Sequence, residues 1–208
     1  KYDIPYHVDC VQSFCKLPIE EFSHLVDGIT ISSHKIGGPK GCGAVYLNPR
    51  RRTVPVFPGV THEKGLRGGT VDTPAIFSFV TSIEHFQYDL EKQWYLRNLL
   101  KQYIENTSCY FVEADVAHQF PSICGLCMKG VEGQYVMLRL NEKGICISTG
   151  SACDINSKSG TKAILAMGID MSEARTFFRV SFGRDTTEEQ IQKLGEALVE
   201  INREIKSR

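Results

Sequence analysis

A chain of 208 residues has room for one large domain, or for one and a half small ones. Its 24 Lys and Arg residues balance its 24 Asp and Glu residues, so no basic surface argues for nucleic acid as a direct partner. Its apolar runs all fall short of the length that a membrane span needs, so we expect no membrane partner either.

The eight cysteines indicate a cellular compartment. Disulfide scaffolds are typical of small secreted domains without a sufficient core, and this chain is large enough to bury one. Several cysteines also lie in apolar, strand-like runs, such as residues 41–46. We therefore expect reduced thiols in a cytoplasmic protein.

The first part of the chain alternates strand-like and helical patterns. Apolar, β-branched runs predict strands at residues 6–10, 28–32 and 43–47, with a short helix near residues 19–25. This alternation favours an α/β layer. Proline and glycine then dominate residues 55–69, which we interpret as an ordered functional loop.

One long helix is predicted after this loop, over residues 73–105. Thr73 fits an N-cap, with Pro74 in the first turn, where proline is tolerated. Apolar residues recur along it at helical spacing: Ile76, Val80, Ile83, Leu90 and Trp94.

The second part predicts a smaller α+β domain. Its last helix, residues 187–205, has one apolar stripe, and Thr187 and Gln190 fit a capping box. We place the domain boundary after residue 95, which gives a large α/β domain with a mixed sheet at residues 1–95 and a small domain at residues 96–208. The other elements expected here are strands at residues 109–113, 122–127, 135–140 and 145–148, and a helix at residues 161–167.

Lys35 is the first candidate for chemistry, at the end of the second predicted strand. It follows Ser32, Ser33 and His34 and precedes a turn rich in glycine and proline. A lysine partly removed from water is a better nucleophile and can form an imine with an aldehyde cofactor. Most lysines at strand ends are solvated, so these four residues alone leave both interpretations open.

Asp9 and Thr70 are candidates for holding a cofactor. A carboxylate in the apolar run at residues 6–11 is costly unless it is paired, and Gln12 follows three residues later. Thr70 ends a glycine-rich loop whose backbone amides can approach a phosphate. A turn cap for Asp9 and an ordinary connection for the loop are the alternatives.

Cys153 and Arg179 are the candidates of the second domain. Cys153 follows small residues and precedes polar ones, which favours an exposed, nucleophilic thiol over a buried structural one. Arg179 is flanked by aromatic and β-branched residues, where simple solvation explains it poorly. Its planar fork suits a substrate carboxylate, and a buried salt bridge is the alternative.

Cys124 and Cys127 have the spacing of a zinc or redox pair. A second pair at ligand spacing is missing from the sequence, since Cys109 and Cys146 stand alone. The run that holds the pair also predicts a strand, on which residues three apart point to opposite faces. We therefore expect no metal here, and a zinc-binding module is the alternative.

In this order, the motifs resemble the NifS/IscS-like cysteine desulfurases, in the class V aminotransferase branch of the fold-type I pyridoxal phosphate enzymes. Each motif alone is moderately specific, and the ordered set, which runs nearly end to end, is strongly specific. The matching stretches are residues 8–13 (VDCVQS), 32–41 (SSHKIGGPKG), 65–70 (GLRGGT), 148–153 (STGSAC) and 178–184 (FRVSFGR).

The resemblance implies pyridoxal 5'-phosphate as the cofactor, bound through an imine to Lys35 in the C-terminal part of a cofactor-binding large domain. It implies that Asp9 pairs with the pyridine nitrogen and that Gln12 meets the ring oxygen. It also implies that Ser32, with Ser33 or His34, binds the phosphate. Thr70 would reach the phosphate of the other subunit in a homodimer.

The same resemblance implies an activity, a sulfur transfer from L-cysteine that leaves L-alanine. Arg179 would bind the substrate carboxylate, and Cys153 would hold the sulfur as a persulfide for an acceptor protein, either an iron–sulfur scaffold or a thiolation enzyme. Residues 154–161 differ from the family's commonest loop, and the chain covers about the second half of a family member. A selenocysteine lyase and a non-catalytic fragment derived from a desulfurase are the alternatives.

Overall fold

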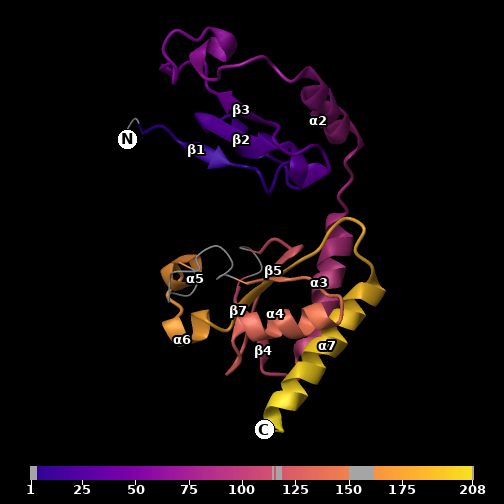
Figure 1. The fold of residues 1–208 in the computed structure, drawn as a ribbon. Coiled ribbons are helices and arrows are strands. Elements are labelled where there is room, and N and C mark those ends of the chain that lie inside the picture. Colours follow the sequence, from indigo (N-terminus) through magenta and orange to yellow (C-terminus); the bar gives the residue numbers. More distant parts are fainter. Residues whose placement is uncertain (1–3, 114, 116–118, 150–161, 208) are drawn as a thin grey trace. The chain divides into compact units, whose positions relative to one another are not determined.

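The structure is a computed structural model, and it describes residues 4–113, 115, 119–149 and 162–207 (Figure 1). The chain divides into two compact units, residues 1–88 and residues 89–208. Both units combine a sheet with helices, as the predicted α/β class requires. The boundary expected after residue 95 falls inside a helix of the second unit, α3 (Leu90–Ile104).

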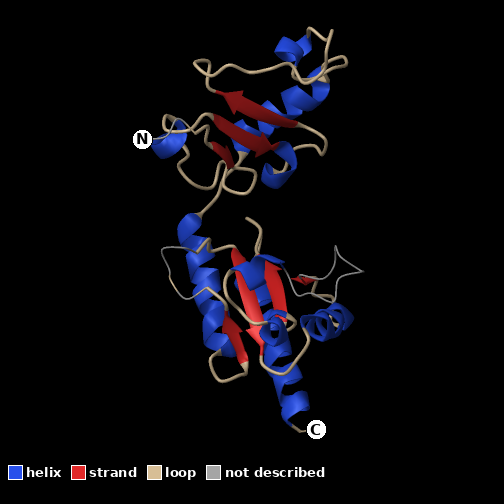
Figure 2. Ribbon diagram, turned by 90° about the vertical axis from the view of Figure 1, so that its left-hand side faces the viewer, coloured by secondary structure: helices blue, strands red, loops and turns tan. Residues whose placement is uncertain are grey.

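The first unit is built on a mixed sheet with the strand order β1-β2-β3 (Figure 2). β1 (His7–Asp9) runs parallel to β2 (Gly28–Ser32), and β3 (Gly43–Leu47) runs antiparallel to β2. These strands lie where the apolar runs predicted them. Because β1 and β2 are parallel, their carboxyl ends lie at the same edge of the sheet.

One carboxylate links all three strands of this sheet. Asp27, just before β2, accepts hydrogen bonds from the backbone N–H of Tyr6 (3.0 Å), from Asn48 Nδ2 (3.3 Å) and from Arg51 Nε (2.8 Å). Tyr6 precedes β1 and Asn48 follows β3. The Arg51 hydrogen bond, followed by that from Tyr6, lowers the pKa of Asp27.

The short helix α1 (Glu20–Ser23), near the predicted position, connects β1 to β2.

The region predicted as one long helix contains two. α2 (Thr73–His85) belongs to the first unit and α3 to the second, so the prediction of a single helix was wrong. The chain leaves helical geometry at Phe86, whose backbone is extended with ψ 124°.

Both helices begin at aspartate caps. Asp72 Oδ1 accepts a hydrogen bond from the N–H of Ala75 (3.0 Å), and Asp89 Oδ1 accepts one from the N–H of Lys92 (2.9 Å). The cap of α2 is therefore Asp72 and not the predicted Thr73, in line with the stronger preference for aspartate at this position.

The second unit has a sheet with the strand order β4-β5-β7-β6, in which neighbouring strands are antiparallel (Figure 2). One face packs against α3 and two later helices, and Leu126 and Phe178 on this face are fully buried. The strands are β4 (Cys109–Phe111), β5 (Ile123–Met128), β6 (Ser148–Thr149) and β7 (Phe177–Ser181).

The strand predicted at residues 135–140 is wrong, since this segment forms the helix α4 (Gly133–Glu142). Val136 and Leu140 are both fully buried, and their spacing of four residues puts them on one face of a helix. Gly133 allows the helix to begin close to β7, because a Cβ there would lie 2.1 Å from the carbonyl oxygen of Phe177.

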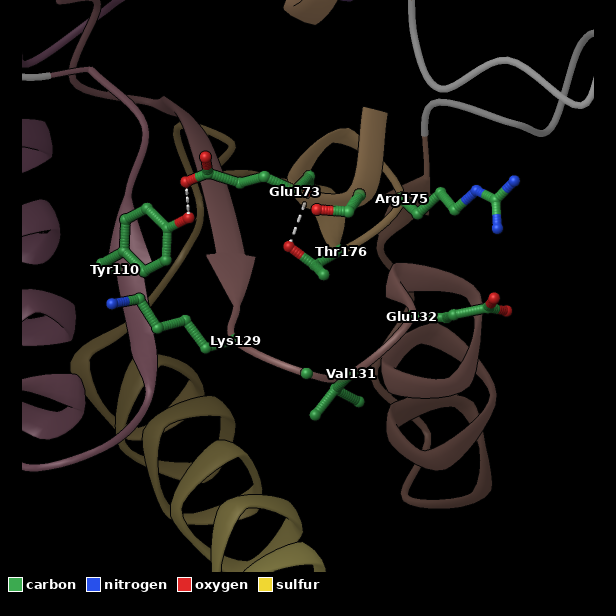
Figure 3. A pocket seen from close by; sticks show the side chains of 9 residues that line it. Tyr110, Lys129, Val131, Glu132, Glu173, Arg175 and Thr176 are labelled. Atoms are coloured by element: carbon green, nitrogen blue, oxygen red, sulfur yellow. Dashed lines mark hydrogen bonds between the residues drawn. The ribbon is translucent and has the colours of Figure 1, made fainter. Parts of the chain in front are cut away.

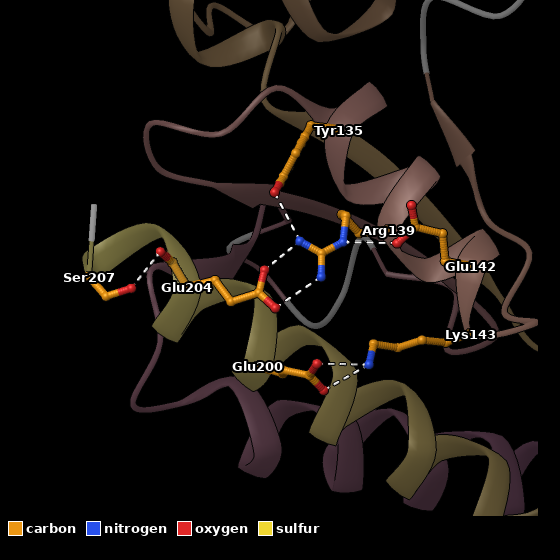
Figure 4. Close-up of polar contacts among 7 residues, drawn as sticks. All are labelled: Tyr135, Arg139, Glu142, Lys143, Glu200, Glu204 and Ser207. Carbon is orange, nitrogen blue, oxygen red and sulfur yellow. Dashed lines mark hydrogen bonds and ion pairs between the residues drawn. The ribbon is translucent and has the colours of Figure 1, made fainter.

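The last helix, α7 (Glu188–Lys206), has the predicted capping box. Thr187 Oγ1 accepts from the N–H of Gln190 (3.3 Å), and Gln190 Oε1 accepts from the N–H of Thr187 (3.1 Å). Ion pairs then fasten α7 to α4 (Figure 4): Arg139 contacts Glu204, and Lys143 Nζ lies 2.8 Å from Glu200 Oε2.

Two short helices lie between β6 and β7 in the chain. α5 (Lys162–Ala166) lies within the predicted helix, and α6 (Met171–Ala174), capped by Asp170, was not predicted. Of the helices in the described ranges, none has the length and apolar character to cross a membrane.

Gly195 of α7 gives the first testable prediction, because a Cβ there would lie 2.4 Å from Cγ and 2.5 Å from Cβ of Tyr103 on α3. Gly195→Ala should lower the free energy of unfolding by about 1–3 kcal/mol through overpacking, measured by urea unfolding. In a Tyr103→Gly background, which removes both of these atoms, the same change should be neutral or stabilising by up to ~1 kcal/mol, since alanine favours helix. Equal losses in both backgrounds would contradict this account.

Candidate functional site

The carboxyl edge of β1 and β2 brings Asp9 and Lys35 to the same side of the first sheet. Asp9 is the last residue of β1 and pairs with Thr30 of β2. Lys35 lies in the 3-10 helix η1 (Ser33–Ile36), which begins as soon as β2 ends. Lys35 is half-buried and Asp9 is exposed.

Asp9 caps the turn after β1, because its Oδ1 accepts a hydrogen bond from the N–H of Val11 (2.9 Å). The turn cap considered from the sequence is therefore present. It occupies one carboxylate oxygen, and among the described residues Oδ2 accepts no hydrogen bond. Gln12, one residue after Val11, is exposed in the same turn.

The two serine hydroxyls that precede Lys35 differ in how accessible they are to solvent. Ser32 Oγ lies 2.8 Å from His34 Nδ1, and His34 is exposed, so this pair forms an accessible polar surface. Ser33 is fully buried, and its Oγ has no hydrogen-bond partner among the described residues. Gly38 closes over it, since a Cβ on Gly38 would lie 2.0 Å from Ser33 Oγ.

Lys16 is a neighbour of Lys35 that the sequence did not single out. Burial lowers the pKa of Lys16, and the charge of nearby Lys35 lowers it further. The parallel pairing of β1 with β2 explains this proximity, because the two lysines lie in the segments that follow these strands. A second amine near the candidate imine-forming lysine could be expected only once that pairing is known.

Thr70 lies apart from this edge in sequence, in the connection between η2 (His62–Gly65) and α2. Its side chain is exposed, and the loop before it contains two non-glycine residues with positive φ, Glu63 (45°) and Lys64 (58°). Both residues lie within η2, so this short turn departs from helical geometry.

Arg179 lies in the middle of β7, on the sheet face opposite α3, α4 and α7. Its direct partners across the sheet are Gly125 of β5 and Ser148 of β6. Its side chain is exposed, and Nη2 donates a hydrogen bond to Ser148 Oγ (3.3 Å). The buried salt bridge considered for Arg179 is therefore wrong.

Cys153, the predicted sulfur acceptor, lies outside the described residues, as do the other residues from 150 to 161. The last described residues before it are Ser148 and Thr149 of β6. Of these two, Ser148 pairs with the candidate carboxylate-binding arginine, Arg179, and Thr149 pairs with Phe178.

Cys124 and Cys127 both lie on β5, where a strand was predicted. Both side chains are fully buried. The Cys124 thiol donates to the carbonyl oxygen of Pro121 (3.6 Å), and burial raises its pKa to about 12. Cys127 Sγ instead lies 3.8 Å from the carbonyl oxygen of Glu173 on α6. Within the described ranges, no three His, Cys, Asp or Glu residues come together as a metal site.

A pocket of about 580 Å³ lies elsewhere in the second unit, between β4, α6 and the turn after β5. At its wall the Tyr110 hydroxyl donates to the Glu173 carboxylate (Figure 3). Burial and this hydrogen bond raise the pKa of Tyr110. The predicted site residues within the described ranges do not line this pocket.

Residues 1–194 match the family model described as "Aminotransferase class-V". The chain belongs to this family. It is 40% identical over 195 residues, 90% of the chain and 49% of the relative, to "Putative cysteine desulfurase NifS" of Bacillus subtilis (strain 168). It is 32% identical over 201 residues, 94% of the chain and 49% of the relative, to "Cysteine desulfurase IscS" of Neisseria meningitidis serogroup C (strain 053442). The chain thus spans about half the length of the curated relatives it matches.

Solved structures agree with this family membership. A "NIFS-LIKE PROTEIN" superposes with a TM-score of 0.81 at 26% identity, over 95% of this chain and 52% of that one. A structure described as "SspA in complex with cysteine" superposes with a TM-score of 0.68 at 29% identity, over 89% of this chain and 52% of that one. The resemblance to NifS/IscS-like proteins, and the α/β fold that it implied, are confirmed.

Cys15, in the turn that leads from Asp9 to Lys16, gives the second prediction. Its φ of 59° is in the left-handed region, which costs a residue with a Cβ about 1–2 kcal/mol. Cys15→Gly should therefore be more stable than Cys15→Ala by about 1 kcal/mol, measured as the difference in urea midpoint. The alanine variant is the matched control because both variants lack the thiol. An alanine variant as stable as the glycine variant would contradict the assigned strain.

Proposed function

We propose that the whole protein is a pyridoxal phosphate-dependent cysteine desulfurase, which converts L-cysteine to L-alanine and holds the sulfur as a persulfide on Cys153. The observation that carries the proposal is the shared carboxyl edge of β1 and β2, where Asp9, Lys35 and the Ser32–His34 pair lie. The NifS and IscS names of the relatives support the reaction, and the solved complex of SspA with cysteine supports the substrate.

The donor set at this edge fits the cofactor. Asp9 has an exposed carboxylate, already held at Oδ1 by the N–H of Val11, which suits a protonated ring nitrogen. Ser32 and His34 form an accessible hydroxyl–imidazole pair, which suits a phosphate better than the fully buried hydroxyl of Ser33. Gln12 is exposed beside Asp9, and we assign it to the ring oxygen. When bound, pyridoxal phosphate supplies an electron sink.

The chain's own residues supply the remaining steps. The Lys35 amine holds the cofactor and, once displaced by the substrate, moves the proton of the substrate Cα as a general base and acid. Arg179 binds the substrate carboxylate, for which its exposed guanidinium is suited. These roles require one free amine and one free guanidinium.

The sulfur moves by nucleophilic attack. The Cys153 thiolate attacks the sulfur of L-cysteine, so an S–S bond forms while the substrate C–S bond breaks. The electron pair of the broken bond stays with the carbon skeleton, which takes up protons and leaves as L-alanine. The persulfide then passes its outer sulfur to an acceptor protein, for which we propose an iron–sulfur scaffold or a thiolation enzyme.

We also propose a homodimer in the cytoplasm. The exposed Thr70 supports the dimer, because its hydroxyl is available to the phosphate of another subunit's cofactor. The free thiols of the described cysteines, among them Cys10, Cys15 and Cys42, fit a reducing compartment.

Lys35→Ala in the full-length protein should abolish the imine with pyridoxal phosphate, because it removes the amine that we assign to this imine. The measurement is borohydride reduction of the loaded protein, followed by mass spectrometry of the labelled peptide. Lys40→Ala, five residues later in an exposed position, is the control and should keep the label. A label retained after Lys35→Ala would exclude this lysine.

Cys153→Ala should keep the visible absorbance of the bound cofactor but lower sulfide release under reductant by at least about 100-fold, since it removes the nucleophile. Cys146→Ala is the matched control, because Cys146 is an exposed cysteine that lies just before β6. Sulfide release at the wild-type rate from the Cys153 variant would show that another group accepts the sulfur.

A further inference from the structure

Two charged side chains flank Gly125 on the Arg179 face of the second sheet. Arg179 is its direct partner on β7, so the two residues share a face. On the other side, Glu113 Oε1 accepts the backbone N–H of Gly125 (3.0 Å) and would lie 3.1 Å from a Cβ placed there. Gly125 itself thus places no side chain between this carboxylate and the exposed guanidinium, and the edge of the Phe177 ring, 3.1 Å from the same Cβ position, borders the space.

Glu113 and Arg179 nevertheless do not pair with each other. Among the described residues, the Arg179 guanidinium has a hydrogen bond only to Ser148 Oγ and no carboxylate partner. Glu113 instead pairs with Arg97 of α3, with 3.4 Å between Oε2 and Nη2. Glu113 is therefore held on the β4 side of Gly125 by a second arginine.

Arg97 is fixed in place by its other contacts. It is 3% exposed, its Nη1 donates to the carbonyl oxygens of Phe120 (3.4 Å) and Ile123 (3.1 Å), and its guanidinium lies 4.6 Å from the centre of the Phe111 ring. These contacts satisfy donors but bring no negative charge.

Glu113 is the anion that the buried Arg97 depends on. Nη1 also lies 3.3 Å from Cys124 Sγ, but burial raises the pKa of this thiol to about 12, so it stays neutral at physiological pH. A buried cation is costly unless it is paired, and Glu113 is its carboxylate partner in the described part of the chain.

We infer that Arg97 and Glu113 are positioning residues for Arg179: Arg97 retains the Glu113 carboxylate, so that Arg179 stays free for the carboxylate of the substrate. This inference rests on the proposed function. Without Arg97, the Glu113 carboxylate, which lies beside Gly125 opposite Arg179 in the register, becomes a competitor of the substrate for the same guanidinium. The expected effect is confined to ligands that carry a carboxylate.

The test measures how tightly the full-length, cofactor-loaded protein binds L-alanine and L-alaninamide. The visible absorbance of the protein reports binding, and it gives a dissociation constant for each ligand. The amide lacks the carboxylate charge, so the ratio of the two constants isolates carboxylate recognition. Arg97→Met should raise the L-alanine to L-alaninamide ratio about tenfold. Arg97→Gln keeps hydrogen-bond donors for the two carbonyl oxygens and should raise the ratio by a similar factor. It replaces Arg97→Met in the test if the methionine variant does not fold.

The double variant Arg97→Met/Glu113→Gln is the decisive control, because it removes both charges and keeps similar side-chain volumes. It should return the ratio to within about twofold of the wild type. A ratio that stays high in the double variant indicates disturbed packing and overturns the inference, as does an unchanged ratio in both Arg97 variants. The KM for L-cysteine should rise in the Arg97 variants while kcat changes little.

Arg179→Gln separates this inference from the proposed function. It should raise the ratio at least as much as Arg97→Met. An unchanged ratio in Arg179→Gln would refute the assignment of Arg179 as the carboxylate ligand. A raised ratio in Arg179→Gln with unchanged ratios in both Arg97 variants would refute only the positioning role.

Discussion

The parallel pairing of β1 with β2 is the constraint on which the candidate cofactor site depends. Parallel strands end at the same edge of a sheet, so the residues that follow them meet there whatever their separation in sequence. Asp9 and Lys35 stand 26 positions apart by residue number, and the register His7↔Gly28 brings their segments together. The same pairing places Lys16 close enough to Lys35 for its pKa to respond.

The sequence predicted local features best where turn residues bound them. Gly28 and Gly43 open strands whose bounds were predicted to the residue. The segment at residues 135–140 failed because a short apolar run fits either period, and only the burial of Val136 with Leu140 reveals a helix. The break between α2 and α3 lacks glycine and proline, and the residue that marks it is Asp89, the cap of α3.

The candidate site also has features that the sequence predicts and features that only the structure shows. Asp9 and Arg179 could be named from the sequence because each is a charged residue within an apolar run, and Lys35 because it follows the end of one. The difference in access between Ser33 and His34 could not, since it depends on how Gly38 closes over the turn. The Arg97–Glu113 ion pair could not be predicted from the sequence either, because it depends on the packing of α3 against the sheet.

The hydrogen bonds that the Asp27 carboxylate accepts make the stability of the first unit depend on pH. Its pKa is lowered in the folded state, so the stability it contributes is complete above its unfolded pKa and declines as pH falls toward the folded value. Protonation would loosen the segments beside β1 and β3 together, because Tyr6, Asn48 and Arg51 share this one acceptor. Acid would therefore loosen this sheet from the amino ends of β1 and β2, the end opposite the one where Asp9 and Lys35 lie.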